Sequence, residues 1–306
     1  MNSFDTNLEK NSANFVPLSP LSFISRVKDI YPNYESLIYG KRKYTWIETY
    51  KRCTKFASAL TKQGIKKGST VSIIAANTPE LFEAHYSIPM TGGVINTINT
   101  RLDAETIAYI LDHSDAQLLI TDTQFSPTMK KALEIYGKKI PIIDIHDDQA
   151  QLKEGEGERI GDWTYEEFLE LGDDNFNWSL PEDEWQAISL SYTSGTTGKP
   201  KGVVYHHRGS YLMSTGSVTA WNMPNKLTFL YTVPMFHCNG WGYPWTAALI
   251  HAKIICCRYI VAKDIYNLID QHKVTHFGGA PIVLSLIANA DEKDKKDIKH
   301  KVFVLT

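Results

Sequence analysis

The sequence of 306 residues contains few cysteines: it has four, and two of them, Cys256 and Cys257, are adjacent. So few cysteines in a chain of this length do not form the disulfide framework typical of small secreted proteins. The chain also lacks an apolar run of about 18 residues, which a membrane-spanning helix needs. Its polar start, from Met1 to Pro20, lacks the apolar centre of a secretory signal. These absences favour a globular protein of the cytoplasm.

An excess of charge of one sign is also missing. Lysine and arginine number 32 against 34 aspartates and glutamates, which leaves a formal net charge of -2. A chain without a net positive field lacks the electrostatic attraction that dominates binding to nucleic acids. We therefore expect no nucleic-acid partner. The 43% of hydrophobic and 22% of charged residues are those of an ordinary enzyme, and the length predicts about two domains.

Strand-like and helix-like segments alternate from about Pro20 onward, as is typical of parallel sheets covered by helices. The pattern predicts an α/β fold with doubly wound sheets and helices on both faces. Strands are predicted at residues 36–39, 43–44, 70–75, 94–98, 117–121, 141–145, 187–192, 228–233, 253–257, 275–278 and 302–306. Helix starts are predicted at two T-x-x-E capping boxes, which begin at Thr45 and Thr164, and after Thr78-Pro79.

An acidic, loop-rich stretch between His146 and Trp185 is interpreted as a boundary. We expect a flexible N-terminus over residues 1–19, a first α/β subdomain over 20–185 and a second over 186–306. The last residues read as a bare strand, and a parallel sheet normally continues into a covering helix. We therefore expect the fold to be truncated at its C-terminal side.

One loop stands out, because Tyr192–Val203 (YTSGTTGKPKGV) combines four Ser/Thr hydroxyls, three glycines and two lysines between two apolar strands. Glycines allow close approach of the backbone, hydroxyl and N–H groups donate to phosphate oxygens, and lysines offset phosphate charge. An ordinary surface turn rarely combines so many donors and cations. A P-loop does not fit, because only two residues separate Gly195 from Gly198 and Pro200 follows Lys199. The composition predicts a polyphosphate-binding loop.

These twelve residues resemble the phosphate-binding signature of the AMP-forming adenylating superfamily, which includes acyl-CoA synthetases, luciferases and nonribosomal adenylation domains. The resemblance covers nearly the whole chain and includes Tyr44–Trp46, Asn77–Glu80 and Gly92-Gly93. Ser69 departs from it, since the family usually has aspartate at this turn.

Two later segments, PMFHCNGW at 234–241 and VTHFGGAP at 274–281, are most similar to those of short- and medium-chain acyl-CoA ligases. That branch includes methylmercaptopropionyl-CoA ligases and plant acyl-activating enzymes. The resemblance implies the N-terminal large domain of the acyl-CoA synthetase fold and the activity of a carboxylic acid:CoA ligase. A carboxylate would attack the α-phosphate of ATP to form an acyl-adenylate, and the thiol of CoA would then displace AMP. ATP, Mg²⁺ and CoA are the implied cofactors, and a small carboxylic acid is the implied substrate.

The resemblance also assigns roles to individual residues. His237 is implied to be catalytic and substrate-binding, because the family uses this histidine to orient the acyl carboxylate, although composition alone favours an ordinary polar role. Trp241 and Gly279 are placed on the acyl pocket. The hydroxyl of Thr193 is implied to contact Mg²⁺. The residues implied to cradle the β- and γ-phosphates are Thr193, Ser194, Gly195, Thr196, Thr197, Gly198, Lys199 and Lys201.

Some neighbouring residues invite other interpretations. Cys238 next to His237 suggests a nucleophile and base, which we reject because adjacent side chains on an extended segment point to opposite faces. Tyr243 and Trp245 are expected in the core. The His206-His207 pair is expected to cap a helix, because no cysteine or carboxylate lies at the spacing of a zinc site.

The resemblance places further parts beyond Thr306: the adenine loop, a Mg²⁺-binding glutamate, a ribose-binding aspartate, and a mobile C-terminal domain with its lysine. We therefore expect the N-terminal portion of a ligase, inactive alone. The alternatives are a non-catalytic nucleotide-binding remnant, or an adenylation domain of the carrier-protein or luciferase type. The identity of the acid and the oligomeric state stay open, with a homodimer as one option.

Overall fold

The computed structural model describes residue 4, residues 6–193 and residues 198–306. Its strands are β1 (Glu35–Tyr39), β2 (Arg42–Thr45), β3 (Thr70–Ile74), β4 (Val94–Thr97), β5 (Ala116–Asp122), β6 (Ile142–Ile145), β7 (Trp163–Thr164), β8 (Ala187–Tyr192), β9 (Gly202–His206), β10 (Thr228–Tyr231), β11 (Lys253–Cys256), β12 (His276–Gly278) and β13 (Phe303–Leu305). Its helices are α1 (Leu21–Ile30), α2 (Trp46–Lys62), α3 (Pro79–Met90), α4 (Ala104–His113), α5 (Ser126–Tyr136), α6 (Tyr165–Glu170), α7 (His207–Ala220), α8 (Tyr243–Leu249), α9 (Ala262–His272) and α10 (Pro281–Ala288). Two 3₁₀ segments are η2 (Thr123–Phe125) and η3 (Cys238–Gly242).

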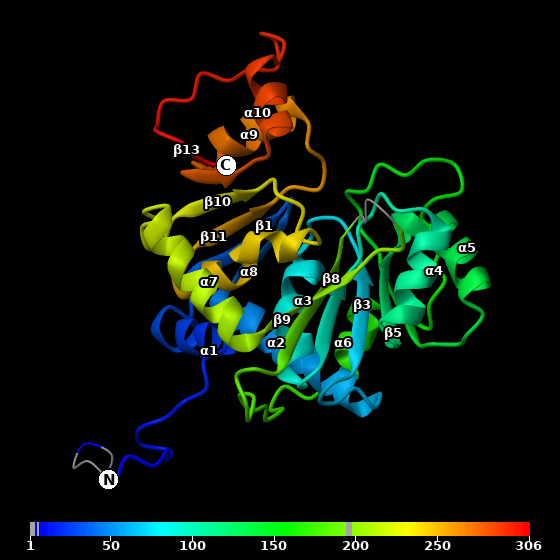
Figure 1. Ribbon diagram of the computed structural model, residues 1–306. Coiled ribbons are helices and arrows are strands. Elements are labelled where there is room, and N and C mark those ends of the chain that lie inside the picture. Colours follow the sequence, from blue (N-terminus) through cyan, green and yellow to red (C-terminus); the bar gives the residue numbers. More distant parts are fainter. Residues whose placement is uncertain (1–3, 5, 194–197) are drawn as a thin grey trace.

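The strands form two sheets (Figure 1). One has the order β7-β6-β5-β3-β4-β8-β9 and the other the order β13-β12-β10-β11-β1-β2. Neighbouring strands are parallel except in the hairpin β1-β2 and the pair β8-β9, each at one end of its sheet. The predicted α/β class with parallel sheets is confirmed.

Each sheet takes strands from both sides of residue 185. The early hairpin β1-β2 joins the sheet of β10 to β13, and the later pair β8-β9 completes the sheet of β3 to β7. The boundary expected between residues 185 and 186 therefore does not separate the two sheets. The acidic stretch includes β7 and α6, and the side chains of Tyr165, Phe168 and Leu169 are buried in the core. Strand pairing, and not order along the chain, decides which sheet a strand enters.

Helices cover both faces of both sheets, as the pattern predicted. Helices α4 and α5 pack on one face of the seven-stranded sheet, around Ile74 and Leu119. Helix α9 packs on the outer face of the six-stranded sheet, around Ile255 and Ile265. The inner faces of the two sheets share one core with α1, α2, α3, α6 and α8. This shared core places the two sheets against each other.

Local signals at helix starts are only partly confirmed. The capping boxes at Thr45 with Glu48 and at Thr164 with Glu167 are both present and begin α2 and α6. Thr78 is the N-cap of α3 and Pro79 its first residue, but the Thr78 hydroxyl makes no capping bond.

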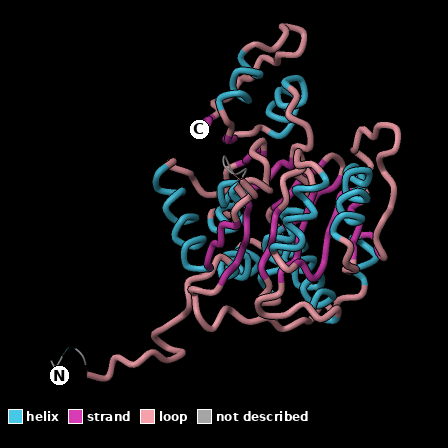
Figure 2. The backbone as a smooth tube through the Cα atoms, turned by 45° about the vertical axis from the view of Figure 1, so that its right-hand side comes forward, coloured by secondary structure: helices cyan, strands magenta, loops and turns pink. Residues whose placement is uncertain are grey.

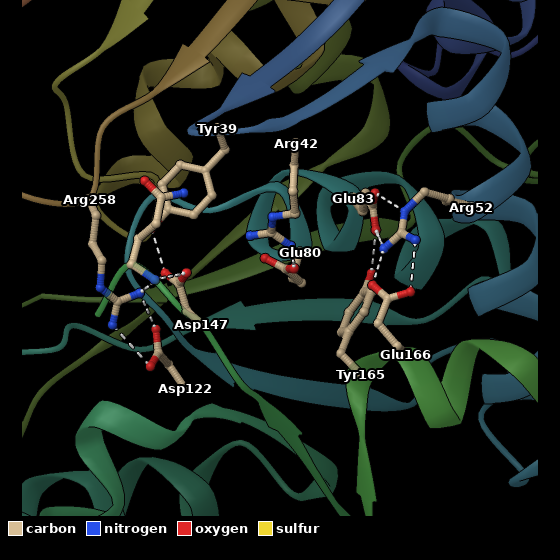
Figure 3. Close-up of polar contacts among 11 residues, drawn as sticks. Tyr39, Arg42, Arg52, Glu80, Glu83, Asp122, Asp147, Tyr165, Glu166 and Arg258 are labelled. Carbon is tan, nitrogen blue, oxygen red and sulfur yellow. Dashed lines mark hydrogen bonds and ion pairs between the residues drawn. The ribbon is translucent and has the colours of Figure 1, made fainter. Parts of the chain in front are cut away.

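Every residue of α3 is buried, including two glutamates. Glu80 pairs with Arg42. The Glu83 carboxylate accepts a hydrogen bond from Arg52 Nε at 2.6 Å and another from the Tyr165 hydroxyl at 2.9 Å (Figure 3). A buried carboxylate is strongly destabilising unless it is paired and hydrogen-bonded. The arginines of β2 and α2 therefore make the burial of this helix possible.

A second buried network links the carboxyl ends of strands in the two sheets (Figure 3). Arg258, which follows β11, contacts Asp122 at the end of β5 at 2.8 Å and Asp147 after β6 at 2.7 Å. The Tyr39 hydroxyl of β1 also donates to Asp147. The side chains of Arg258, Asp122 and Asp147 are at most 3% exposed. The charged groups of the two sheets therefore pair with one another and are shielded from water.

The N-terminal end of the described chain lies away from the core, whereas Leu305 of β13, near the other end, belongs to it (Figures 1 and 2). The described residues before α1 extend from the body, but Ser19 is buried and its hydroxyl lies 2.8 Å from His207 Nδ1, so the chain is anchored before residue 20. None of the residues of α10 is buried, and Ile282 is 77% exposed. Within the described chain, no helix has both the length and the apolar character needed to cross a membrane.

The Arg258 network gives a stability prediction. Arg258→Met leaves two buried carboxylates without their cation, so we expect the free energy of unfolding to fall by about 3–5 kcal/mol. Urea unfolding followed by tryptophan fluorescence measures this loss. Lys67→Met, which removes an exposed pair with Glu182, is the control and is expected to leave stability nearly unchanged. A loss no larger than that of the control would contradict the role of the network.

His85 gives a pH prediction. Its Nδ1 donates to the Leu81 carbonyl at 2.7 Å, its Nε2 has no partner, and complete burial lowers its pKa from 6.5 to about 4. The unfolded chain therefore binds a proton between pH 6.5 and 4 that the folded chain excludes, and stability falls as the pH is lowered through this window.

The expected contribution of His85 to this slope is at most about 1.4 kcal/mol per pH unit. Urea unfolding from pH 7 to pH 4 should show a shallower loss in His85→Gln than in the unaltered protein. His146→Gln, at an exposed histidine, is the matched control. An unchanged slope in His85→Gln would rule out this assignment.

Candidate functional site

The segment that carries His237 leaves β10 and is held by a residue that follows β3 of the other sheet. Asn77, between β3 and α3, donates through Nδ2 to the carbonyls of Tyr231 and Val233, both at 2.9 Å. Its Oδ1 accepts from the Met235 N–H at 2.8 Å. One amide therefore fixes three backbone groups just before His237. The position of this segment thus depends on how the two sheets pack against each other.

The next residues form a left-handed turn. Cys238, Asn239, Gly240 and Trp241 all have positive φ, between 42° and 59°. This conformation is costly for residues other than glycine, and asparagine tolerates it best. The Tyr231 hydroxyl donates to the Gly240 carbonyl at 2.8 Å and supports the turn.

The expectation of an extended segment at His237 and Cys238 is wrong. Because Cys238 adopts φ 46°, its Sγ lies 3.9 Å from His237 Nε2 and does not point to the opposite face. A nucleophile with a histidine base also needs a group that orients the imidazole. Among the described residues no other side chain hydrogen-bonds the His237 ring. The structure therefore gives no support for a Cys/His nucleophile. The reason is that no described side chain orients the imidazole, and not that the two side chains point to opposite faces.

Two cavities meet at this turn. The first has a volume of about 310 Å³ and contains the described start of the glycine-rich loop. It is named the nucleotide-side cavity after the ATP that the sequence resemblance implies. His237 lies in its wall and is exposed. The lining residues are Thr97, Asn99, Leu102, Ile110, Ser191, Tyr192, Thr193, Pro200, Val203, Tyr205, Phe236, His237 and Cys238.

The second has a volume of about 590 Å³ and lies between α7, β9 and the left-handed turn. It is named the acid-side cavity after the carboxylic acid that the sequence resemblance implies. Its lining residues are Val204, Tyr205, His206, Gly209, Ser210, Met213, Ser217, Trp221, Cys238, Asn239, Trp241 and Trp245. Most of this wall is aromatic or aliphatic, as in sites for small organic ligands. Tyr205 and Cys238 line both cavities, so the two spaces adjoin there.

The described ends of the glycine-rich loop close the pair β8-β9, as the strand-loop-strand context predicted. The Thr193 N–H donates to the Lys201 carbonyl at 3.0 Å. The ammonium of Lys199 lies 4.9 Å above the ring of Tyr109. Gly198, Lys199 and Lys201 are exposed. Of the residues assigned to phosphate binding, Ser194, Gly195, Thr196 and Thr197 lie outside the described residues.

Helix α4 supports this loop. The Tyr109 hydroxyl donates to the Pro200 carbonyl at 3.3 Å, and His113 Nδ1 lies 2.7 Å from the Tyr192 hydroxyl. Sequence reasoning missed both α4 residues, because their contacts with the loop join segments about 80 to 90 positions apart.

The structure brings together His237, Thr193 and Trp241 around the two cavities, but it does not bring Gly279 there. The Gly279 N–H donates to the Leu305 carbonyl at 3.0 Å, and Gly279 lines neither cavity. Its neighbour Gly278 lies next to a residue of the acid-side cavity. A Cβ atom at Gly278 would lie 3.6 Å from the ring of Trp241, which lines that cavity.

Tyr243 and Trp245 are buried in the core as expected, although Trp245 also reaches the acid-side cavity. His206 caps α7 by accepting from the Gly209 N–H at 2.8 Å, which confirms the capping interpretation. In the part of the chain that the structure describes, no group of three His, Cys, Asp or Glu side chains could hold a metal ion.

Sequence reasoning missed Met213, Trp221 and Asn239. Met213, Ser217 and the C-cap residue Trp221 follow one another at intervals of four, so they lie along one side of α7 and its end. This spacing could have indicated them from the sequence. Nothing local marks Asn239, because its role depends on two serines of β8.

Comparison with known proteins adds to this geometry. A family model described as AMP-binding enzyme matches residues 25–305. The peroxisomal acetate/butyrate–CoA ligase AAE7 of Arabidopsis thaliana is 42% identical, over 98% of this chain and 54% of its own length. The acetate–CoA ligase CCL3 of Humulus lupulus is 45% identical over the same shares. This chain thus spans about half the length of the curated relatives it matches.

A solved structure shows the same fold. The inhibitor-bound N-terminal domain of FACL13 from Mycobacterium tuberculosis matches with a TM-score of 0.79 at 21% identity, over 94% of this chain and 69% of that one. This match confirms the fold expected from the resemblance. Since the family model covers the chain from residue 25 to residue 305, the chain belongs to the AMP-binding enzyme family.

Proposed function

We propose that this chain forms the ATP- and acid-binding part of an ATP-dependent carboxylic acid:CoA ligase. The observation that carries the proposal is the meeting of the two cavities at Tyr205 and Cys238. An acid in the apolar cavity would present its carboxylate to a nucleotide bound beside the glycine-rich loop. A carboxylate oxygen then attacks the α-phosphorus of ATP, pyrophosphate leaves, and the sulfur of CoA later displaces AMP. The relatives named as acetate and acetate/butyrate ligases support a short acid.

The proposed roles of the residues follow from charge and position. Lys199 and Lys201 offset the charge of the triphosphate, and His237 orients the carboxylate where the two cavities adjoin. Such positioning and charge stabilisation suffice for attack by a weak nucleophile, and no covalent enzyme intermediate is needed. Trp241 forms part of the wall around the acyl chain. CoA, as the second substrate, is proposed on the basis of the family alone.

Magnesium is proposed as a companion of ATP. No carboxylate lines the nucleotide-side cavity in the described part of the chain, but Thr193, which carries a hydroxyl, does. Mg²⁺ usually keeps several waters and binds substrate phosphates with few protein ligands, so one hydroxyl fits this mode. In this proposal the phosphates hold the ion and Thr193 adds a contact.

We propose the cytoplasm as the compartment. The peroxisome is the alternative, because the Arabidopsis relative AAE7 is named as peroxisomal. The proposed partners are small molecules, and a homodimer remains a proposal as well.

Cys238 offers a direct test of the acid-binding role. It is the exposed cysteine of the four, and burial raises the pKa of the Cys53, Cys256 and Cys257 thiols, which keeps them unreactive. Butanoate with ATP is expected to slow alkylation of Cys238 by iodoacetamide, about tenfold at ten times the Kd. Mass spectrometry follows the reaction.

Two controls accompany this measurement. Cys238→Ser should lose the labelling in the folded protein, and butanamide, which lacks the carboxylate, should protect less than butanoate. Unchanged labelling at saturating butanoate and ATP would contradict the proposed acid site.

Lys199 tests the nucleotide side. Lys199→Met removes a charged donor to phosphate, and a charge-assisted hydrogen bond is worth about 1.5–3 kcal/mol, so we expect MgATP to bind roughly ten- to a hundredfold more weakly. Isothermal titration calorimetry measures the Kd. Lys139→Met, at another exposed lysine, is the matched control. Equal affinity in the two variants would exclude Lys199 from the phosphate site.

A further inference from the structure

One side of α7 forms a long wall of the acid-side cavity. Gly209, Met213 and Ser217 line it, followed by Trp221, the C-cap residue of the helix. At 1.5 Å per residue these positions cover about 18 Å along the helix axis. Tyr205, where the nucleotide-side cavity adjoins, comes just before the helix. The cavity therefore runs along α7, and a carboxylate that reaches the nucleotide lies beside the start of the helix.

The side chain of Met213 reaches the opposite wall part-way along this helix. Gly242, which follows the left-handed turn, has no Cβ, and a Cβ atom there would lie 1.8 Å from Met213 Cε and 2.9 Å from Met213 Sδ. The end of the methionine side chain thus occupies the space that the glycine leaves open. Because Met213 belongs to α7, its side chain connects the helix with the turn, and these are two of the walls between which the cavity lies.

Met213 is held in this position but can leave it. The Ser217 hydroxyl donates to the Met213 carbonyl at 2.9 Å and also lies 3.3 Å from Met213 Sδ. The residue is nevertheless 39% exposed, so its side chain borders solvent as well as the cavity. Methionine is unbranched, has three rotatable bonds and adapts readily to its surroundings. Met213 therefore has the properties of a movable barrier.

The position of Met213 limits the length of chain that fits on the carboxylate side. His206, which also lines the cavity, precedes Met213 by seven residues, or about 10 Å along the helix axis. Carbon atoms in contact stay about 3.5–4 Å apart. An extended chain of single bonds advances roughly 1.2 Å per bond, as in a polypeptide backbone. The space before Met213 therefore accommodates about five carbon–carbon bonds, which is the chain of hexanoate.

We infer that Met213 sets the length of the linear carboxylic acids that this site accepts, with a limit of about six carbon atoms. This inference rests on the proposed acid-binding function. The part of the cavity beside Ser217 and Trp221 lies beyond the barrier, and an acid reaches it only when the side chain of Met213 moves aside. Ser217 is a positioning residue, because it acts on the acid through its contact with the methionine sulfur.

The test compares linear acids of increasing length: butanoate, hexanoate, octanoate and decanoate. Calorimetry at pH 8 measures the Kd of each acid in the presence of α,β-methylene ATP, whose methylene bridge prevents the release of pyrophosphate. Protection of Cys238 from iodoacetamide reports occupancy of the cavity. Neither readout requires turnover. The informative quantity is the ratio of the Kd of hexanoate to the Kd of octanoate within each variant.

In the unaltered protein, the Kd is expected to fall about fourfold per methylene up to hexanoate and then to stay nearly constant, so the ratio is about one. Met213→Ala removes the barrier, and the ratio is expected to rise to about tenfold. Met213→Gln keeps the length of the side chain and should therefore keep the limit. Leu212→Ala is the matched control, because Leu212 is exposed on the same helix and lines neither cavity.

The other outcomes are distinct. If the Kd of the unaltered protein falls steadily from butanoate to decanoate, Met213 is no barrier and the inference is overturned, while the proposed acid site stands. If the limit near hexanoate persists in Met213→Ala, another part of the wall sets the length, which also overturns the inference. If no acid binds or protects Cys238 in any variant, the proposed function itself fails, and the inference with it.

Discussion

Helix α3 is buried along its whole length, and this burial is the constraint on which the rest of the structure depends. The helix belongs to the core shared by both sheets. It can lie there only because guanidinium groups from β2 and α2 neutralise Glu80 and Glu83. A carboxylate in such a place without a cation would cost several kcal/mol by general experience with buried ions. The pairings therefore select one arrangement of the two sheets around the helix.

That arrangement also positions the candidate site. The Tyr86 hydroxyl donates to the Pro244 carbonyl at 2.5 Å, and the Trp245 indole N–H donates to the His85 carbonyl at 3.1 Å. These bonds attach α3 to α8, which follows the left-handed turn and contributes Trp245 to the acid-side cavity. Asn77, just before α3, holds the strand exit that leads to His237. One buried helix thus sets both ends of the segment that carries His237 and Asn239.

The parts of the fold that sequence could predict are those that depend on neighbours in the chain. Alternating apolar segments, the capping boxes at Thr45 and Thr164, and the glycine-rich loop are local signals, and the corresponding elements are present. The pairing of β1 with β11 is not local, since more than 200 residues separate Leu37 from its partner Ile254. The boundary expected at residue 185 does not coincide with a division between the sheets, because each sheet pairs strands from both sides of it.

Prediction of the site had the same limit. The resemblance assigned roles to His237, Thr193 and Trp241, which line the two cavities, and to Gly279, which lines neither. The left-handed turn could not be predicted from the sequence FHCNGW. Three of its four residues, Cys238, Asn239 and Trp241, are not glycines, so this conformation has a free-energy cost for them. That cost is offset by Tyr231, Ser189 and Ser191, which lie on strands of both sheets. The shape of the acid-side wall is therefore a consequence of how the sheets dock. A change in the core around α3 should act on ligand selection through this turn, even without touching the cavity.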